Sequence, residues 1–201
     1  VSNSPRSTVV SGDPAALDVL LAAVEGAGVF CRRVKVDVAS HSPQMDPLLA
    51  DLVDLLRDVR PQPARIPLRS TVTAAPVQGP ELGAPYWARN LRAPVLFARA
   101  IQDLAAEGHT IFVELSPHPI LLPSVQENLQ AQQRDGAVVA SMRRDADERA
   151  VLLGAIGELW VRGVDVDLAH LGVLRPLDLL AGQALHSPQE SQLVLGHKDE
   201  V

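Results

Sequence analysis

Short segments rich in β-branched residues alternate with longer segments of helical hydrophobic spacing over most of this chain. The short segments predict strands, and the longer ones predict amphipathic helices that bury one face. Strands are expected over 8–11, 29–36, 66–70, 110–115 and 137–141, and helices after Asp13, over 43–59, from Pro94 to Gly108, over 120–132 and from Asp145 or Asp147 to Gly163. Because this alternation is typical of sheets covered by helices, the sequence predicts an α/β fold.

Capping residues support the first of these helices. Asp13 is a good N-cap, Pro14 suits the first helical turn, and Gly28 is typical of a helix end. The apolar strand over 110–115 is expected to be central in its sheet. The helix over 43–59 is expected to bury the apolar residues that recur along it, namely Met45, Leu48, Leu49, Leu52, Leu55 and Leu56.

The composition excludes several classes of protein. Of the 201 residues, 47% are hydrophobic and 21% are charged, as in folded globular domains, so disorder of the whole chain is excluded. The net charge of −6 argues against nucleic acid as a partner, and no apolar run reaches the roughly 18–20 residues of a membrane span. The single Cys31 excludes a disulfide framework, and the histidine spacing predicts no metal site. A cytoplasmic location is expected.

The turn around His41 carries the most chemical interest. A strand is expected to end before it, and Ser42-Pro43 is expected to begin a helix, so the imidazole lies at a sheet edge where active sites are often built. The partial positive charge of a helix N-terminus disfavours the imidazolium form and keeps a base neutral. The alternative, and by spacing alone the more common one, is a hydrogen-bonded structural histidine.

Two serines, Ser40 and Ser42, flank this histidine. Residues adjacent in sequence rarely form a nucleophile–base pair, because the partner must be oriented across space. No G-x-S-x-G nucleophile elbow occurs in the sequence. If His41 is a base, its nucleophile is therefore expected to lie outside this chain.

Three further segments have both a structural and a functional interpretation. Asn3-Ser4-Pro5 is typical of a turn that leads into a strand. The segment 85–92 holds two aromatic residues and two arginines, and it is interpreted as a packed loop ahead of a helix. Glu114, in the apolar strand before Ser116-Pro117-His118-Pro119, would need a partner if buried, either in a salt bridge or in a site.

Taken in order, these segments resemble the acyltransferase domain of modular type I polyketide synthases, relatives of malonyl-CoA:acyl-carrier-protein transacylases. The resemblance covers roughly residues 1–171 of this chain, which correspond to the C-terminal portion of the family's domain. It is carried by Asn3-Ser4-Pro5, Val9-Val10-Ser11-Gly12, Val38-Ala39-Ser40-His41-Ser42, Tyr86-Trp87, Asn90-Leu91-Arg92, Phe112-Val113-Glu114-Leu115-Ser116-Pro117-His118-Pro119 and, near its end, Trp160 with Gly163-Val164-Asp165-Val166-Asp167.

The resemblance implies a division of the chain. Residues 1–37 would be the later part of a ferredoxin-like small subdomain, and residues 38–144 the C-terminal part of an α/β-hydrolase-like acyltransferase core. Residues 145–171 would be a linker helix and strand that follow the core. The polar tail over 172–201 is expected to be disordered or foreign to the domain.

The resemblance also implies a ping-pong acyl transfer. In the family, a serine on a Gly-His-Ser elbow takes a malonyl-type group from a CoA thioester and passes it to the phosphopantetheine thiol of an acyl carrier protein. The expected partners are the acyl-CoA substrate, the carrier protein and the remaining domains of a polyketide synthase. No bound cofactor is expected.

The family's functional positions match five residues of this chain. His41 matches the general base, and Asn90 matches the residue whose backbone carbonyl holds the other imidazole nitrogen. Asn3 matches an asparagine near the mouth of the site. Ser40 and Val38 belong to the specificity motif: serine before the histidine is usual for methylmalonyl selection, whereas Val38 replaces the tyrosine that usually accompanies it.

The sequence departs from the family in lacking the glutamine motif of the oxyanion hole, the elbow and the arginine that pairs the substrate carboxylate. It is therefore expected to be a fragment, a split sequence or the product of a truncated reading frame, and to be inactive alone. The alternative is a non-catalytic remnant or docking module of a synthase. An unrelated half of a serine hydrolase is a third and weaker hypothesis.

Overall fold

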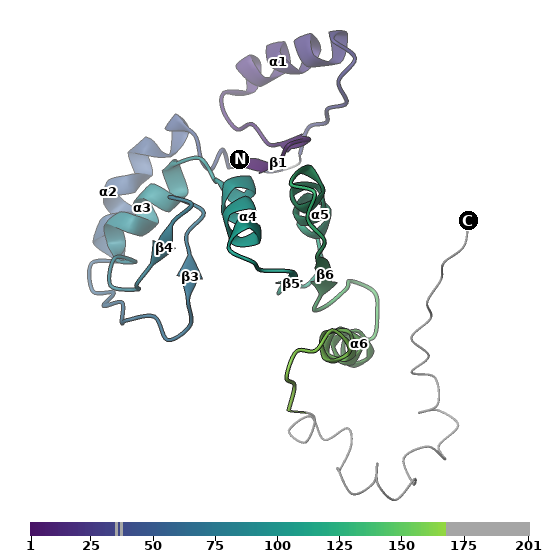
Figure 1. The fold of residues 1–201 in the computed structure, drawn as a ribbon. Helices are drawn as coiled ribbons and strands as arrows, with labels where there is room; N and C mark the ends of the chain where they lie inside the picture. Colours follow the sequence, from purple (N-terminus) through teal and green to yellow (C-terminus); the bar gives the residue numbers. More distant parts are fainter. Residues whose placement is uncertain (35, 37, 168–201) are drawn as a thin grey trace, which may run out of the picture. The chain divides into compact units, whose positions relative to one another are not determined.

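The computed structural model describes residues 1–34, 36 and 38–167 (Figure 1). The expected tail over 172–201 and the last four residues of the expected linker lie outside the described residues, as do Lys35 and Asp37. The chain divides into two units, residues 1–151 and residues 152–201.

The helices and strands follow one another in an order that mixes both types. In chain order they are β1 (Ser2–Ser4), β2 (Ser7–Thr8), α1 (Pro14–Gly26), the 3₁₀-helix η1 (Pro43–Leu48), α2 (Leu49–Leu55), β3 (Leu68–Arg69), β4 (Pro76–Val77), α3 (Ala84–Arg92), α4 (Phe97–Ala106), β5 (Ile111–Glu114), α5 (Leu122–Ala131), β6 (Ala137–Ala140) and α6 (Glu148–Val161). The predicted α/β class is confirmed.

The first unit contains a β5–α5–β6 crossover (Figure 1). β5 and β6 pair in parallel with Ile111 opposite Ala137, and the intervening helix is the connection that a parallel pair needs. α4 and α5 supply a buried cluster of Ile101, Ala105, Val125 and Leu129. The strands expected over 110–115 and 137–141 are confirmed. The expected central position of the first is wrong for the described sheet, in which β5 pairs with β6 alone.

Local signals predicted the first helix well. Asp13 Oδ1 accepts a hydrogen bond from Ala16 N at 3.0 Å, and Gly28 adopts a φ of 75° just after the helix. The strand expected over 29–36 is wrong for the described residues, which pair with no described strand. β-branched residues do not form a strand without a neighbour to complete the ladder, and here Phe30 is 87% exposed.

The helix expected over 43–59 is shorter and divided. Pro47 lacks an N–H and its ring collides with the carbonyl four residues earlier, so the segment begins as η1 and becomes α-helical only from Leu49. Of the six apolar residues expected in the core, only Met45 is buried, while Leu48 and Leu55 are exposed. That expectation is therefore wrong for most of the helix.

The segment over 85–92 is a helix and not a packed loop. α3 begins after Gly83, has Pro85 in its first turn and buries Ala84 and Ala88. Tyr86 anchors it, because its hydroxyl lies 2.8 Å from Ser70 Oγ. Two small residues four apart and a proline in the first turn are the helical signals that the aromatic and basic residues obscured.

The boundaries of the later helices show similar local control. α4 begins at Phe97, three residues after the proline expected to open it, and Gly108 follows it with a φ of 99°. Asp147, not Asp145, caps α6, because its Oδ1 accepts from Ala150 N at 2.7 Å.

Within residues 1–34, 36 and 38–167, no helix has the length and apolar character needed to cross a bilayer.

Candidate active site

His41 lies in the turn just before η1, with a left-handed backbone conformation (φ 63°) that is uncommon for residues other than glycine. Its backbone N–H donates to Leu91 O at 2.8 Å, and its ring Nδ1 lies 2.9 Å from Ala93 O. A carbonyl oxygen can only accept, so Nδ1 carries the proton and Nε2 is left with the basic lone pair. This is the tautomer that a general base needs.

The carbonyl that holds the imidazole belongs to Ala93 and not to Asn90, so that part of the sequence interpretation is wrong. Ala93 follows the last residue of α3 with an extended backbone (φ −76°, ψ 155°). Its carbonyl therefore turns away from the helix axis, whereas Asn90 lies within the helix, where carbonyls run along the axis.

Ser42, beside the histidine, has a structural role. It is 2% exposed, and its Oγ donates to Ala39 O at 2.7 Å while accepting from Gln44 N at 3.2 Å. Ser42 is the N-cap of η1, and the helix start expected at Ser42-Pro43 is confirmed. Its buried and fully used hydroxyl is consistent with the expectation that it is no nucleophile.

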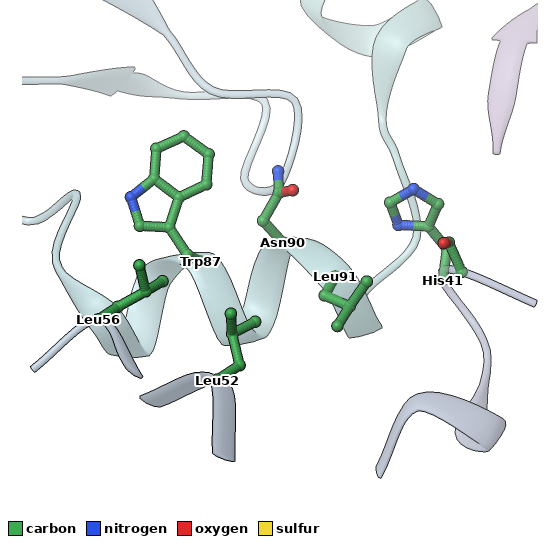
Figure 2. Close-up of a pocket in the computed structure, with 7 residues that line it drawn as sticks. His41, Leu52, Leu56, Trp87, Asn90 and Leu91 are labelled. Carbon is green, nitrogen blue, oxygen red and sulfur yellow. The ribbon is translucent and has the colours of Figure 1, made fainter. Parts of the chain in front are cut away.

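A cavity of about 520 Å³ lies beside His41. Figure 2 shows Trp87, Asn90 and Leu91 along α3, Leu52 and Leu56 nearby, and His41 beyond the Leu91 end of the helix. The lining residues are Ser40, His41, Leu52, Leu56, Trp87, Asn90 and Leu91. The site thus combines an imidazole, a hydroxyl and an amide with an apolar wall.

Three of the five predicted site residues, Ser40, His41 and Asn90, line this cavity, and two do not. Val38 is 56% exposed. Asn3 is tied to α5, because its carbonyl accepts from Asn128 Nδ2 at 2.8 Å. The position of Asn3 is thus set by a buried amide 125 residues away, which no local pattern reveals.

Sequence reasoning missed the apolar wall and the acceptor carbonyl. Leu52 and Leu56 are four residues apart, a spacing that predicts a core position, but both line the cavity. Trp87 lines it as well, although its sequence context, an aromatic and basic cluster, indicates only packing. Ala93 carries no side-chain chemistry, so only the backbone geometry identifies it.

An ion pair lies close to the loop that carries His41. Arg92 Nε, at the end of α3, pairs with Asp46 Oδ1 in η1.

The residues that the structure describes contain no group of three or more His, Cys, Asp or Glu arranged to hold a metal ion.

Glu114 proves to be a capping residue and not part of a salt bridge or of the cavity beside His41. Its carboxylate accepts from the backbone N–H groups of Ile120, Leu121 and Leu122 at 2.9, 3.0 and 3.1 Å, and from Ser116 Oγ at 3.0 Å. Burial raises the pKa of Glu114, but these four hydrogen bonds outweigh it and hold the pKa below the ordinary value. The carboxylate therefore stabilises the start of α5.

The chain is similar to known proteins over most of its length. Residues 1–166 match the family described as the acyl transferase domain. The chain is 46% identical over 166 residues to the spectinabilin polyketide synthase system protein NorA of Streptomyces orinoci, covering 82% of this chain and 9% of that protein.

Two solved structures of acyltransferases are similar to this chain. The acyltransferase domain from module 8 of the salinomycin polyketide synthase superposes with a TM-score of 0.79 at 45% identity, covering 82% of this chain and 39% of that one. A loading acyltransferase from the avermectin modular polyketide synthase gives a TM-score of 0.73 at 37% identity, covering 79% and 49%. The chain spans less than half of each of these relatives.

The resemblance drawn from the sequence motifs is confirmed by this match, which extends over most of the chain and includes the turn around His41 and the end of α3. The chain belongs to the acyl transferase domain family, in the form found in modular polyketide synthases.

Proposed function

We propose that this chain supplies the general-base half of an acyltransferase centre that moves a malonyl-type group from a CoA thioester to the phosphopantetheine thiol of an acyl carrier protein. The observation that supports the proposal is the contact of 2.9 Å between His41 Nδ1 and Ala93 O. It leaves Nε2 as the basic nitrogen, beside a cavity with room for an acyl group.

In the proposed reaction, His41 Nε2 takes the proton of a serine hydroxyl as the serine oxygen attacks the thioester carbonyl. The imidazolium then returns that proton to the departing CoA sulfur, which leaves an acyl-serine. The second half repeats these steps with the carrier thiol as nucleophile and the serine oxygen as leaving group. The Ala93 carbonyl takes the place of a triad carboxylate, because fixing the tautomer needs an acceptor and not a charge.

The serine itself is proposed to come from outside these 201 residues, since the sequence has no G-x-S-x-G elbow. The chain alone is therefore proposed to be inactive. The other proposed partners are the remaining domains of a polyketide synthase, and no bound cofactor is proposed.

Substrate selection is proposed to depend on Ser40, which lines the cavity next to the base. A small residue there leaves room for a branch at the acyl α-carbon, so methylmalonyl is modestly favoured over malonyl. One methyl group in an apolar pocket is worth only about 1–3 kcal/mol. Val38 is not among the lining residues, and because it replaces the usual tyrosine, malonyl stays the alternative substrate.

We further propose the domain division that the family resemblance implies. Residues 1–37, with the β1–β2 hairpin and α1, would belong to a ferredoxin-like subdomain, and residues 38–144 to the acyltransferase core. Residues 145–171, which include α6, would form the linker that follows. Asn90 is proposed as a site residue because it lines the cavity, and Asn3 as a residue near the mouth of the site because the family resemblance implies it.

The test uses a reconstituted domain in which residues 1–167 replace the matching part of the salinomycin module 8 acyltransferase domain. His41→Ala should lower the rate of acyl-enzyme formation by about two to four orders of magnitude, the range for a general base. His109→Ala, which changes an exposed histidine after α4, is the matched control and should leave the rate unchanged. A full rate in the His41 variant would instead favour the structural histidine of a non-catalytic docking module.

A further inference from the structure

We propose that the ion pair between Asp46 and Arg92 positions His41, by holding the loop that carries the imidazole against the carbonyls that orient it. The inference deepens the proposed function and rests on it, because orientation matters only if His41 acts as a base. Both residues are positioning residues, since neither lines the cavity.

Three links join the two segments concerned, residues 39–46 and residues 91–93. Two of them are made by His41 itself, through its backbone N–H to Leu91 O and its Nδ1 to Ala93 O. The third is the pair of Asp46 Oδ1 with Arg92 Nε. Arg92 lies between the two acceptor residues, so the ion pair holds the stretch of chain that orients the imidazole.

The loop needs such support for a conformational reason. The left-handed backbone of His41 is disfavoured for a residue with a Cβ atom and persists only where its surroundings hold it. Ser42 holds the loop internally, through Ala39 O and Gln44 N. The ion pair adds a side-chain link from outside the loop that does not involve His41 itself.

Charge and burial favour this pair over an ordinary surface contact. Arg92 is the last residue of α3, where the negative end of the helix dipole favours a cation. The side chains of Arg92 and Asp46 are 34% and 55% exposed, against 66% and 71% for Arg57 and Asp54 in the ion pair at the end of α2. Partial burial reduces screening by solvent, so the Asp46–Arg92 pair restrains its two segments more firmly.

Loss of the pair should therefore change the imidazole before it changes the fold. With η1 and the end of α3 free to separate, the carbonyl of Ala93 no longer lies within constant reach of Nδ1. The imidazole then exchanges the single Nδ1–H tautomer for a mixture of both, and Nε2 is protonated for part of the time. A base whose Nε2 carries the proton cannot accept another there.

The experiment uses the chain as it is, labelled with ¹⁵N, at a pH high enough to keep histidine side chains neutral. Long-range ¹H–¹⁵N spectra report the tautomer of each histidine, and His41→Gln identifies the signals of His41. Asp46→Asn and Arg92→Gln should each lower the Nδ1–H to Nε2–H ratio of His41 by about two- to five-fold, the range expected for a partly exposed ion pair. Asp54→Asn, which breaks the pair on α2, is the matched control and should leave the ratio unchanged.

A rescue separates positioning from a general effect on stability. The exchanged pair Asp46→Arg with Arg92→Asp should recover part of the ratio, but not all, because a carboxylate at the C-terminal end of α3 opposes the helix dipole. Arg92→Lys keeps the charge and should retain most of the ratio, which provides a second comparison if Asp46→Asn folds poorly.

Three results would overturn the inference: an unchanged His41 tautomer in Asp46→Asn and Arg92→Gln, an equal change in Asp54→Asn, or loss of the folded amide spectrum in both single variants and Arg92→Lys. None of these depends on acyl transfer. The inference can therefore fail while the rate loss of His41→Ala stands, and a full rate in His41→Ala would end the proposed function without altering the tautomer result.

Discussion

The backbone carbonyl of Ala93 lies 2.9 Å from Nδ1 of His41, 52 positions earlier in the chain. The contact joins the turn before η1 to the residue that ends α3, and it selects one tautomer of the imidazole. An acyltransferase centre built on this contact needs no acidic third member, since the neutral carbonyl accepts the hydrogen bond that the Nδ1–H donates.

The first prediction concerns the chain alone. Incubation with labelled malonyl-CoA or methylmalonyl-CoA should leave no covalent label, because His41 has no elbow serine to deprotonate in these 201 residues. Intact-protein mass spectrometry measures the label directly. A stable, stoichiometric acyl adduct would contradict the prediction, and mapping it to Ser40 would identify an unexpected nucleophile.

The second prediction concerns substrate choice in the reconstituted domain. Ser40→Phe should shift competition between the two thioesters towards malonyl, because a bulky ring fills the space beside the acyl α-carbon. The expected change in the ratio is about 10-fold, within the range for one methyl group. Val38→Phe is the control and should have less effect, since Val38 does not line the cavity.

Competition between methylmalonyl-CoA and malonyl-CoA in the unsubstituted domain tests whether the space beside Ser40 favours the branched substrate. A preference for malonyl of tenfold or more before any substitution would show that the space beside Ser40 does not select the branch.

The third prediction concerns pH and the Glu114 cap. Because hydrogen bonding holds the pKa of Glu114 below its ordinary value of 4.5, the unfolded chain binds the proton first as the pH falls. The stabilisation by Glu114 is therefore fully present above that ordinary value and is lost as the pH falls through the lower, folded-state pKa.

Glu114→Gln should lower the free energy of unfolding at pH 7 by about 1–2 kcal/mol, the range for a helix cap. The difference from the unsubstituted chain should shrink in urea titrations carried out at progressively lower pH. Asp135→Asn, at an exposed position after α5, should show neither effect. A difference that stays constant to pH 3 would contradict the assignment of the cap.

The fourth prediction concerns side-chain packing at Gly136, the residue just before β6. A Cβ atom at Gly136 would lie 2.8 Å from Leu129 Cδ1 and 3.0 Å from Thr110 O. Leu129 is fully buried and has little room to move, so Gly136→Ala should destabilise the domain by about 1–3 kcal/mol. Thermal or urea unfolding measures the loss.

The control for packing is Gly26→Ala at the end of α1, where a Cβ atom meets nothing within 4 Å. There the substitution should be neutral, or should stabilise by up to about 1 kcal/mol through the unfolded chain. Equal losses at Gly136 and Gly26 would show that the close contact with Leu129 is not what matters.

Local sequence determined those parts of the fold whose causes are local. Asp13 and Asp147 each accept, through a carboxylate oxygen, a hydrogen bond from a backbone N–H in the first turn of a helix. Gly28 and Gly163 adopt the left-handed conformation that ends a helix. Each signal acts within a few residues, so it can be recognised before the chain is folded. The motif around His41 is also contiguous, and it is one of the segments whose order along the chain carried the family resemblance.

Only the tertiary structure decided the contacts between distant segments. The β-branched stretch over 29–36 has strand propensity, but a strand also needs a partner to accept its hydrogen bonds, and the described residues include none. Leu52 and Leu56 have core spacing, yet they line the cavity because α3 lies beside them. The acceptor of His41 is a backbone carbonyl at Ala93, and every residue has such a carbonyl, so its choice depends on where α3 ends in space and not on the identity of the side chain.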